Sequence, residues 1–302
     1  MTKMKYFLSS TLLLLALLLP MNVAAYDFEV DGIYYNINGD EATVTYEEIF
    51  YDHGAVPHYY SDYSGDVVIP SSVSHDGKTY PVTAIGNYAF DYCGSLTSVT
   101  IPNSVTAIGH MAFYSCYELT SVVIGNSVTA IGSCAFQECS RLTSVNIPNS
   151  VKTIGFGAFE SCINLTSVTL GNAVTSIGRS AFYGCNNLSD INFPKSLTNL
   201  SSDTFARTAW YDNQPDGLVY AGLVAYQYKG EMPVGTSITL DDCTVAIADG
   251  AFSGCAGLSD IFIPNTVIGI GSWAFGRCTN LTNIVIPNSV TTIGEGAFNG
   301  CI

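Results

Sequence analysis

The stretch that decides the fold is LTSVTIPNSVTAIGHMAFYSCYE, residues 96–118. Val99 and Ile101 are two residues apart, which is the spacing of a short strand with one buried face. The following Pro-Asn-Ser turns the chain, and residues 105–108 form a second short extended piece that ends at Gly109. The apolar positions after it, Ala112, Phe113 and Cys116, have the spacing of one helical or 3-10 turn.

The same pattern recurs every 23 residues, and an Ala-Phe pair (Thr-Phe in one repeat) marks each copy. A single copy cannot bury its apolar residues alone, but stacked copies place each side chain on its counterpart. The repeat therefore predicts a solenoid of nine coils. Their phenylalanines are Phe90, Phe113, Phe136, Phe159, Phe182 and Phe205, and, after an interruption, Phe252, Phe275 and Phe298.

Several segments depart from the period. Residues 26–63 are rich in tyrosine and in strand-forming residues and are expected to cap the first coil. Asp76-Gly77 predicts a hairpin turn within the first coil, and residues 211–234 predict a second hairpin insertion between coils 1–6 (residues 64–210) and coils 7–9 (residues 235–302). The chain stops before the ninth coil is complete, so a C-terminal cap is missing. We expect a fragment of a longer protein, and the alternative is that the open end pairs with a partner.

Residues 1–25 have the features of a secretory signal peptide. Lys3 and Lys5 precede an apolar run, and Val23-Ala24-Ala25 is a small-residue cleavage site. The run is shorter than the roughly 20 residues that a bilayer-spanning helix needs. We therefore expect cleavage after Ala25 and a secreted or surface-located chain without membrane insertion.

The charge balance limits the class of partner. The chain has 25 acidic and 10 basic residues, and loss of the two lysines of the signal peptide takes the net charge from −15 to −17. Nucleic acids and anionic membrane surfaces are disfavoured as partners, because they require clusters of lysine and arginine. The acidic excess is typical of a well-solvated exported protein.

The chemistry-bearing residues follow the repeat and give no catalytic pattern. Eight of the ten cysteines occupy one column, which predicts buried thiols because stacked side chains point the same way and cannot face each other in a disulfide. Cys134 and Cys243 lie outside the column and are expected to be exposed. The histidines have no metal-ligand spacing, and adjacent Ser74, His75 and Asp76 cannot converge as a catalytic triad does. The sequence predicts no catalytic residue, metal site or cofactor.

The coil consensus resembles the BspA-like (Treponema-type) class of bacterial leucine-rich repeats. The resemblance rests on Leu-x-x-Val-x-Ile-Pro-x-x-Val-x-x-Ile-Gly-x-x-Ala-Phe-x-x-Cys at residues 96–116 and covers about residues 64–302. With the period, it predicts an α/β repeat fold: a right-handed leucine-rich-repeat solenoid of nine 23-residue coils, with short strands and short helical or 3-10 turns. It further implies a bacterial surface or secreted protein, with members implicated in adhesion to host proteins. Ser104 stands where better-known leucine-rich repeats have an asparagine ladder.

We expect a binding protein and no enzyme, with an extracellular protein or glycan ligand, such as a host matrix protein. The alternative is a repeat spacer that displays a separate C-terminal domain. The candidate binding residues point outward from the first strand of each coil or are aromatic residues of the second interruption. They are Ser98, Thr100, Ser121, Ser144, Asn146, Ser167, Thr169, Asp190, Asn192, Asp260, Phe262 and Asn283 on the strands, and Trp210, Tyr211, Tyr220 and Tyr228 in the interruption. The same residues would also suit a solvated face and a packed hairpin.

Overall fold

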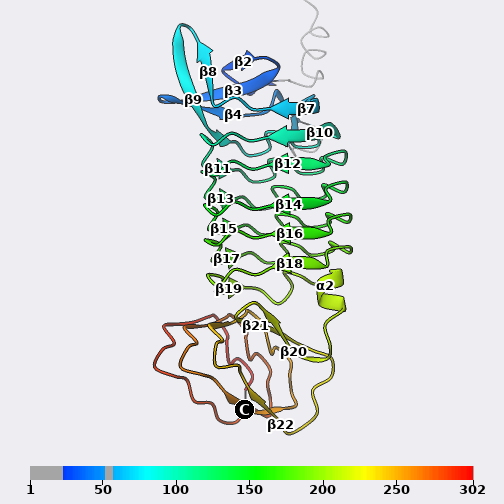
Figure 1. Cartoon of the computed structure of the whole chain (residues 1–302), viewed down its shortest axis with the longest axis vertical. Helices are drawn as coiled ribbons and strands as arrows, with labels where there is room; N and C mark the ends of the chain where they lie inside the picture. Colours follow the sequence, from blue (N-terminus) through cyan, green and yellow to red (C-terminus); the bar gives the residue numbers. More distant parts are fainter. Residues whose placement is uncertain (1–22, 52–56, 302) are drawn as a thin grey trace, which may run out of the picture.

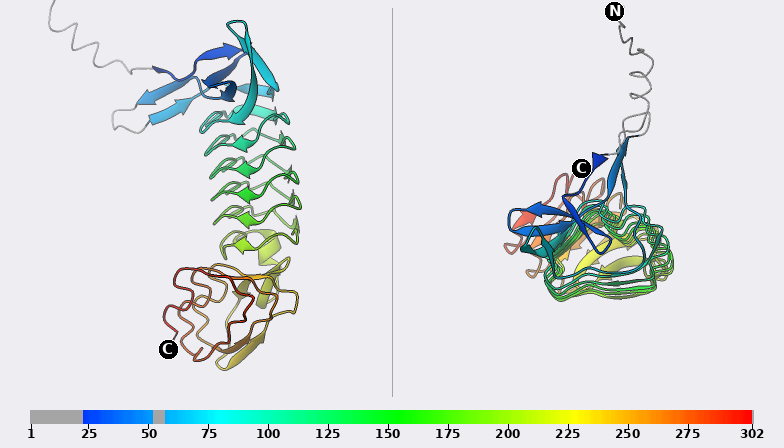
Figure 2. Two further views of the ribbon diagram at one scale, coloured as in Figure 1. Left: turned by 90° about the vertical axis from the view of Figure 1, so that its left-hand side faces the viewer. Right: turned by 90° about the horizontal axis from the view of Figure 1, so that it is seen from above.

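The computed structural model describes residues 23–51 and 57–301 and shows a stack of coils below a strand-rich N-terminal end (Figure 1). Seen from above, the coils of the upper part superpose as closed loops around a common interior (Figure 2). The predicted 23-residue coil is confirmed, because parallel strands pair residue for residue at that spacing: Ile108 with Ile131, and Ile131 with Ile154.

One side of the stack is a parallel sheet of two-residue strands. It continues into the N-terminal strands in the order β19-β17-β15-β13-β11-β9-β4-β3-β2. Its strands within the coils are β11 (Ala107–Ile108), β13 (Ala130–Ile131), β15 (Thr153–Ile154), β17 (Ser176–Ile177) and β19 (Asn199–Leu200).

The other side carries longer strands in two three-stranded pieces, β12-β10-β7 and β14-β16-β18. These strands come from the Ser-Val-Thr positions of the repeat. They are β7 (Ser64–Val68), β10 (Ser95–Thr100), β12 (Ser121–Val123), β14 (Ser144–Asn146), β16 (Ser167–Thr169) and β18 (Asp190–Asn192).

The N-terminal end is antiparallel. Strand β4 pairs in parallel with β9 of the first coil and so joins the end of the stack. The hairpin predicted at Asp76-Gly77 is present between β8 and β9, with His75 opposite Lys78. The strands of this end are β1 (Val23–Ala24), β2 (Phe28–Val30), β3 (Ile33–Asn38), β4 (Glu41–Val44), β5 (Glu48–Tyr51), β6 (Pro57–Tyr60), β8 (Ser72–His75) and β9 (Lys78–Ile85).

The phenylalanines form a column in the core that runs from Phe90 to Phe205, and a second column that runs from Phe252 to Phe298. From Phe90 to Phe205, successive rings stack with centroids 4.7–5.5 Å apart and planes within 10° of parallel. Six of the following cysteines donate their thiols to the phenylalanine carbonyl of the preceding coil, as Cys116 does to Phe90 at 3.1 Å and Cys162 to Phe136 at 3.1 Å. The column thus buries apolar area and provides partners for buried carbonyls in these coils.

The turn that carries the phenylalanine differs from the prediction. The expected helical or 3-10 turn over residues 112–116 is absent, and the segment consists of hydrogen-bonded turns. Met111 and Ser115 have φ of 51° and 55°, on either side of the Ala-Phe pair. A left-handed residue at each end prevents a helix from forming, so the fold is nearly all β, and α2 is its one helix within the described residues.

The stack is interrupted after Phe205. Thr208, which replaces cysteine in the column, donates to Phe205 O at 2.7 Å and accepts from Tyr211 N, so it caps helix α2 (Ala209–Asp212). The predicted hairpin follows as β20 (Gly217–Ala221) and β21 (Val224–Lys229), and β21 pairs in parallel with the next coil.

The hairpin of β20 and β21 therefore begins a second block of coils, residues 217–301. This second block is distinct from the first block, residues 64–208. Its sheet has the order β20-β21-β23-β25-β26, with β22 and β24 paired separately. The second block turns aside from the vertical stack of the first (Figure 1). Its remaining strands are β22 (Thr236–Thr239), β23 (Ala246–Ile247), β24 (Leu258–Phe262), β25 (Gly269–Ile270) and β26 (Thr292–Ile293).

Candidate binding surface

The outward positions of β10, β12, β14, β16 and β18 form what we call the strand face. Each strand turns its central residue inward, as Val99, Val145 and Val168 do, and its two flanking residues outward. Parallel pairing aligns the flanking residues in two columns within each three-stranded piece, and β12 lies beside β14 where the pieces meet. The strand face consists of Ser98, Ser121, Ser144, Ser167 and Asp190 in one column and Thr100, Val123, Asn146, Thr169 and Asn192 in the other.

Most of the strand face is open to solvent. Ser98, Thr100 and Ser167 are half-buried, and the other seven residues are exposed. Thr100 pairs with Val68 on one side and Val123 on the other, and these valines are 68% and 55% exposed. The face is therefore flat and rich in hydroxyl and amide groups, and an exposed apolar strip lies at its N-terminal end.

Carboxylates lie at both ends of the serine column. At the N-terminal end Asp66 accepts hydrogen bonds from Ser98 Oγ at 2.6 Å and Thr97 Oγ1 at 2.9 Å. These bonds lower the pKa of Asp66, so its carboxylate is ionised at neutral pH. At the other end Asp190 is exposed. The neutral middle of the strand face is thus flanked by negative charge.

The remaining predicted strand residues belong to the second block. Ser237 pairs with Asp260 and Thr239 with Phe262 across β22 and β24. Phe262 is 56% exposed, and Asn283 is also exposed, although it lies outside the strands. The predicted residues therefore form two groups, because the interruption separates β18 from β22.

The four aromatic residues of the interruption are half-buried and pack against the core. Trp210 contacts Phe193 and Phe205, with ring centroids 5.1 and 5.2 Å apart. Tyr211 meets Tyr226 at 5.9 Å, and Tyr228 likewise lies against the core. Tyr220 Oη accepts from Asp241 N at 3.0 Å. These contacts hold the hairpin against the coils and leave only part of each ring available to a partner.

Sequence reasoning missed a tyrosine cluster on the turns of the first coils. Tyr92 and Tyr114 meet edge to face at 5.3 Å, and the hydroxyls of Tyr114 and Tyr117 each lie 3.5 Å from the Glu138 carboxylate. Ser115 Oγ donates to Glu138 at 2.9 Å. Burial, with the nearby charge of Glu138, raises the pKa of Tyr114 to about 12. Ser115 and Glu138 are 23 residues apart, which is one period, so their contact could have been predicted from the repeat.

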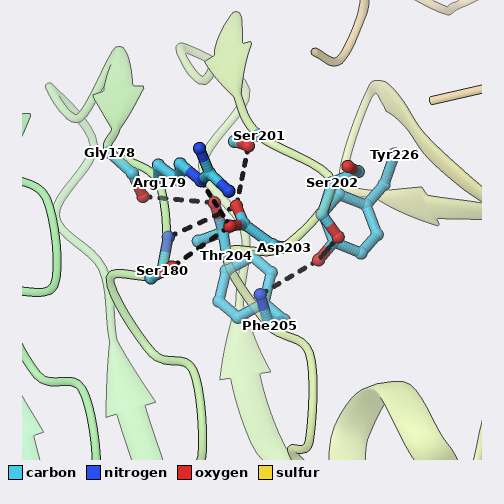
Figure 3. Close-up of polar contacts among 9 residues, drawn as sticks. All are labelled: Gly178, Arg179, Ser180, Ser201, Ser202, Asp203, Thr204, Phe205 and Tyr226. Carbon is cyan, nitrogen blue, oxygen red and sulfur yellow. Dashed lines mark hydrogen bonds and ion pairs between the residues drawn. The ribbon is translucent and has the colours of Figure 1, made fainter. Parts of the chain in front are cut away.

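A second polar cluster, also missed, lies at the end of the first block. Asp203 accepts from Arg179 Nε at 2.8 Å, Ser201 Oγ at 2.8 Å and Ser180 Oγ at 3.1 Å (Figure 3). Burial alone would raise the pKa of Asp203, but these hydrogen bonds outweigh burial and lower it. The carboxylate is therefore held ionised and in one orientation.

Most of the thiols are buried, as the repeat predicts. Seven of the ten cysteines are buried, and Cys243 is exposed as expected. The expectation for Cys134 is wrong, because it lies in the left-handed turn with its side chain buried against the next coil. His75 stacks on Phe28 at 4.4 Å, whereas Ser74 contacts Thr79, so this pair does not converge. Across the described residues no group of three or more His, Cys, Asp or Glu side chains could hold a metal ion.

Coils closed by parallel strands, each filled by leucine, isoleucine, valine and phenylalanine in register, define a leucine-rich-repeat solenoid. The family model described as BspA type Leucine rich repeat region matches residues 83–210 and 227–302 with 6 copies. These ranges cover more than half of the chain, and the chain belongs to this family.

Solved structures of bacterial proteins share the fold. A leucine rich cell surface protein from Faecalibacterium prausnitzii A2-165 is 26% identical, with a TM-score of 0.52 over 93% of this chain and 86% of that one. A leucine-rich repeat protein of T. pallidum is 24% identical, with a TM-score of 0.50 over 91% and 88%. The pneumococcal vaccine antigen PcpA is 20% identical, with a TM-score of 0.50 over 91% and 79%. No curated protein matches this sequence.

Proposed function

We propose that the chain is a secreted or cell-surface bacterial protein that binds an extracellular protein, such as a host matrix protein, through the strand face. The observation that carries this proposal is the pair of in-register columns from Ser98 to Asn192, which lie open to solvent over five coils. Hydroxyl and amide groups on a rigid, flat sheet suit the hydrogen bonding of a broad protein interface. The solenoid is a scaffold of stacked coils, and we infer no catalytic role for it.

Export is supported by the sequence of residues 1–25, of which residues 1–22 lie outside the described part. Val23 and Ala24 pair with Ile49 and Glu48, so cleavage after Ala25 would remove strand β1. No helix within the described ranges has the length and hydropathy of a bilayer span. A surface location also agrees with the similar Faecalibacterium protein, which is a cell surface protein. We propose residues 26–63 as a cap and residues 64–301 as the binding solenoid.

The test is binding of residues 26–302 to immobilised extracellular-matrix proteins, with mucosal glycans on the same plate. Ser144 and Ser167 pair with each other at the centre of the strand face. The double variant Ser144→Arg/Ser167→Arg places two long cations there and is expected to weaken binding at least tenfold, because buried interface positions tolerate neither bulk nor unpaired charge.

The same coils provide a matched control on the opposite sheet. Thr153 and Ser176 pair across β15 and β17, so Thr153→Arg/Ser176→Arg makes the same charge change in equivalent strands. Binding is expected to be retained in this control. Equal loss in both double variants, or binding of no matrix protein, would overturn the proposal and favour the spacer function.

A further inference from the structure

The junction between the two blocks contains a crevice of about 310 Å³, outside the strand face. Ser201 and Asp249 form a parallel bridge there, and Ser202 N donates to Asp249 O at 2.9 Å. Asp203 and Arg179 line it from the first block, and Ser272 and Trp273 from the second. Its volume lies at the low end of the ~300–1,000 Å³ of small-molecule sites.

The first-block wall is a fixed pair of opposite charges. Asp203 orients Arg179 through Nε, as Figure 3 shows. The arginine side chain is nevertheless 74% exposed, and within the described residues it bonds through Nε. Both terminal nitrogens of Arg179 are therefore available as donors, held in place by a carboxylate that three other groups also bind.

The second-block wall is an aromatic platform. A Cβ atom at Gly296 would lie 2.9 Å from the Trp273 indole, and one at Gly276 would lie 3.1 Å from it, so the ring rests against glycine backbone. Trp273 is still 44% exposed, and its φ is 56°. The neighbouring coils have Gly250 and Gly296 at this position, with φ of 67° and 60°.

Positive φ is common to this position of the repeat, with values of 61° at Tyr88, 51° at Met111 and 55° at Ser180. In the other coils this position carries glycine or a side chain that is half-buried or buried, as Tyr88, Met111 and Cys134 are. Trp273 differs from these residues because its indole is exposed. A ligand that stacks on the ring would cover this exposed surface.

The polar groups around the platform are mixed donors and acceptors. Arg179 offers N–H groups, and Asp249 offers a carboxylate that accepts from Ser272 N at 2.6 Å. The carboxylates of Asp203 and Asp249 both line the crevice and would repel a phosphate or another anion. No group of three acidic, histidine or cysteine residues in the described chain suits a metal. A sugar ring has an apolar C–H face for stacking and hydroxyls that both donate and accept.

We propose that this crevice binds a neutral pyranose unit of a saccharide, with Trp273 beneath the ring and with Arg179 and Asp249 bonding its hydroxyls. The site is independent of the strand face, so either proposal can fail without the other. The test begins with residues 26–302 on an array of neutral glycans. Titration of the soluble methyl glycoside of the bound sugar follows, at millimolar concentration, by NMR.

Trp273→Gly restores the residue that the neighbouring coils have, so the variant is expected to fold and to have an unchanged or higher Tm. Its sugar affinity is expected to fall at least tenfold, because the stacking platform is lost. Arg179→Met is expected to weaken binding several-fold. Arg141→Met provides the matched control, because Arg141 pairs with Glu118 in a distant coil. Absence of binding to every neutral glycan, or unchanged affinity in Trp273→Gly, would overturn the proposal.

Discussion

Replacing Phe159 by alanine tests whether the ring column holds the coils together. The Phe159 side chain has no exposed surface, and it stacks on Phe136 at 5.2 Å and on Phe182 at 5.3 Å, with planes within 6° of parallel. Truncation of a buried phenylalanine typically lowers the free energy of unfolding by about 3–5 kcal/mol. Each lost ring pair is worth about 0.5–1.5 kcal/mol of that loss, so two pairs place Phe159→Ala near the upper end, at about 4–5 kcal/mol.

Leucine at the same position keeps most of the apolar volume but loses both ring pairs. Phe159→Leu is therefore expected to lower the free energy of unfolding by about 1–3 kcal/mol. Phe156, three residues earlier in the same coil, is 48% exposed. Phe156→Ala is the matched control and is expected to change the free energy of unfolding by less than about 1 kcal/mol.

Urea unfolding followed by far-ultraviolet circular dichroism measures these differences over the whole chain. Tryptophan fluorescence reports on the junction and the second block, because the two tryptophans are Trp210 and Trp273. In a repeat array a weakened coil can separate the transitions of its neighbours. We therefore expect that, in Phe159→Ala, the unfolding midpoint measured by circular dichroism lies at a lower urea concentration than the midpoint measured by tryptophan fluorescence. Equal losses in Phe159→Ala and Phe156→Ala would refute the stacking argument.

Three further predictions concern the turns, a buried carboxyl and the thiols. Arg277 has a φ of 60° where the neighbouring coil has Gly254, so Arg277→Gly is expected to raise the free energy of unfolding by about 1 kcal/mol, and Arg277→Ala to leave it unchanged in urea titrations. Burial raises the pKa of Asp91 from 3.8 to about 7. The folded chain then retains a proton that the unfolded chain releases, so stability falls as the pH rises from about 4 to 7. Asp91→Asn is expected to remove that decline in urea titrations at several pH values, and an identical decline in the variant would contradict the assignment. Finally, Cys243 is the one exposed cysteine among ten. A thiol reagent should therefore modify one group rapidly in the native chain and none rapidly in Cys243→Ser.

The period made the interior of the fold predictable. Inward residues such as Val99, Ile108 and Phe113 have the same surroundings in every coil, so the same residue types recur at a spacing that can be counted. Many side-chain contacts follow the same rule, because residue n lies beside residue n+23. Ser115 and Glu138 are one period apart, and Arg179 and Asp203 are separated by 24 residues. Had the columns been compared for charge, both clusters could have been predicted.

The left-handed turns were not predictable in the same way. Met111, Cys134 and Ser180 all have positive φ, although none is glycine. Such residues give no local signal of the conformation, because the backbone is held there by hydrogen bonds to the next coil, such as Met111 N to Ser133 O. The prediction of a helical turn and the prediction that Cys134 is exposed were both wrong, because neither allowed for the left-handed backbone of this turn. The Ser201–Asp249 bridge was also beyond prediction, since the insertion places its partners two coils' length apart.

The two proposed sites follow from how the repeat divides its residues. Inward columns are fixed by packing and are nearly identical from coil to coil, so they can distinguish no ligand. Recognition has to come from positions where coils differ, or where the stack is broken. The strand face is of the first kind, because its columns change from serine to aspartate and from valine to asparagine while Val99, Val145 and Val168 stay the same beneath them. The junction is of the second kind. Thr208 starts a helix where a cysteine would have continued the column, and the hairpin that follows separates Phe205 from Phe252. The crevice lies at that break, between Asp203 of the first block and Trp273 of the second.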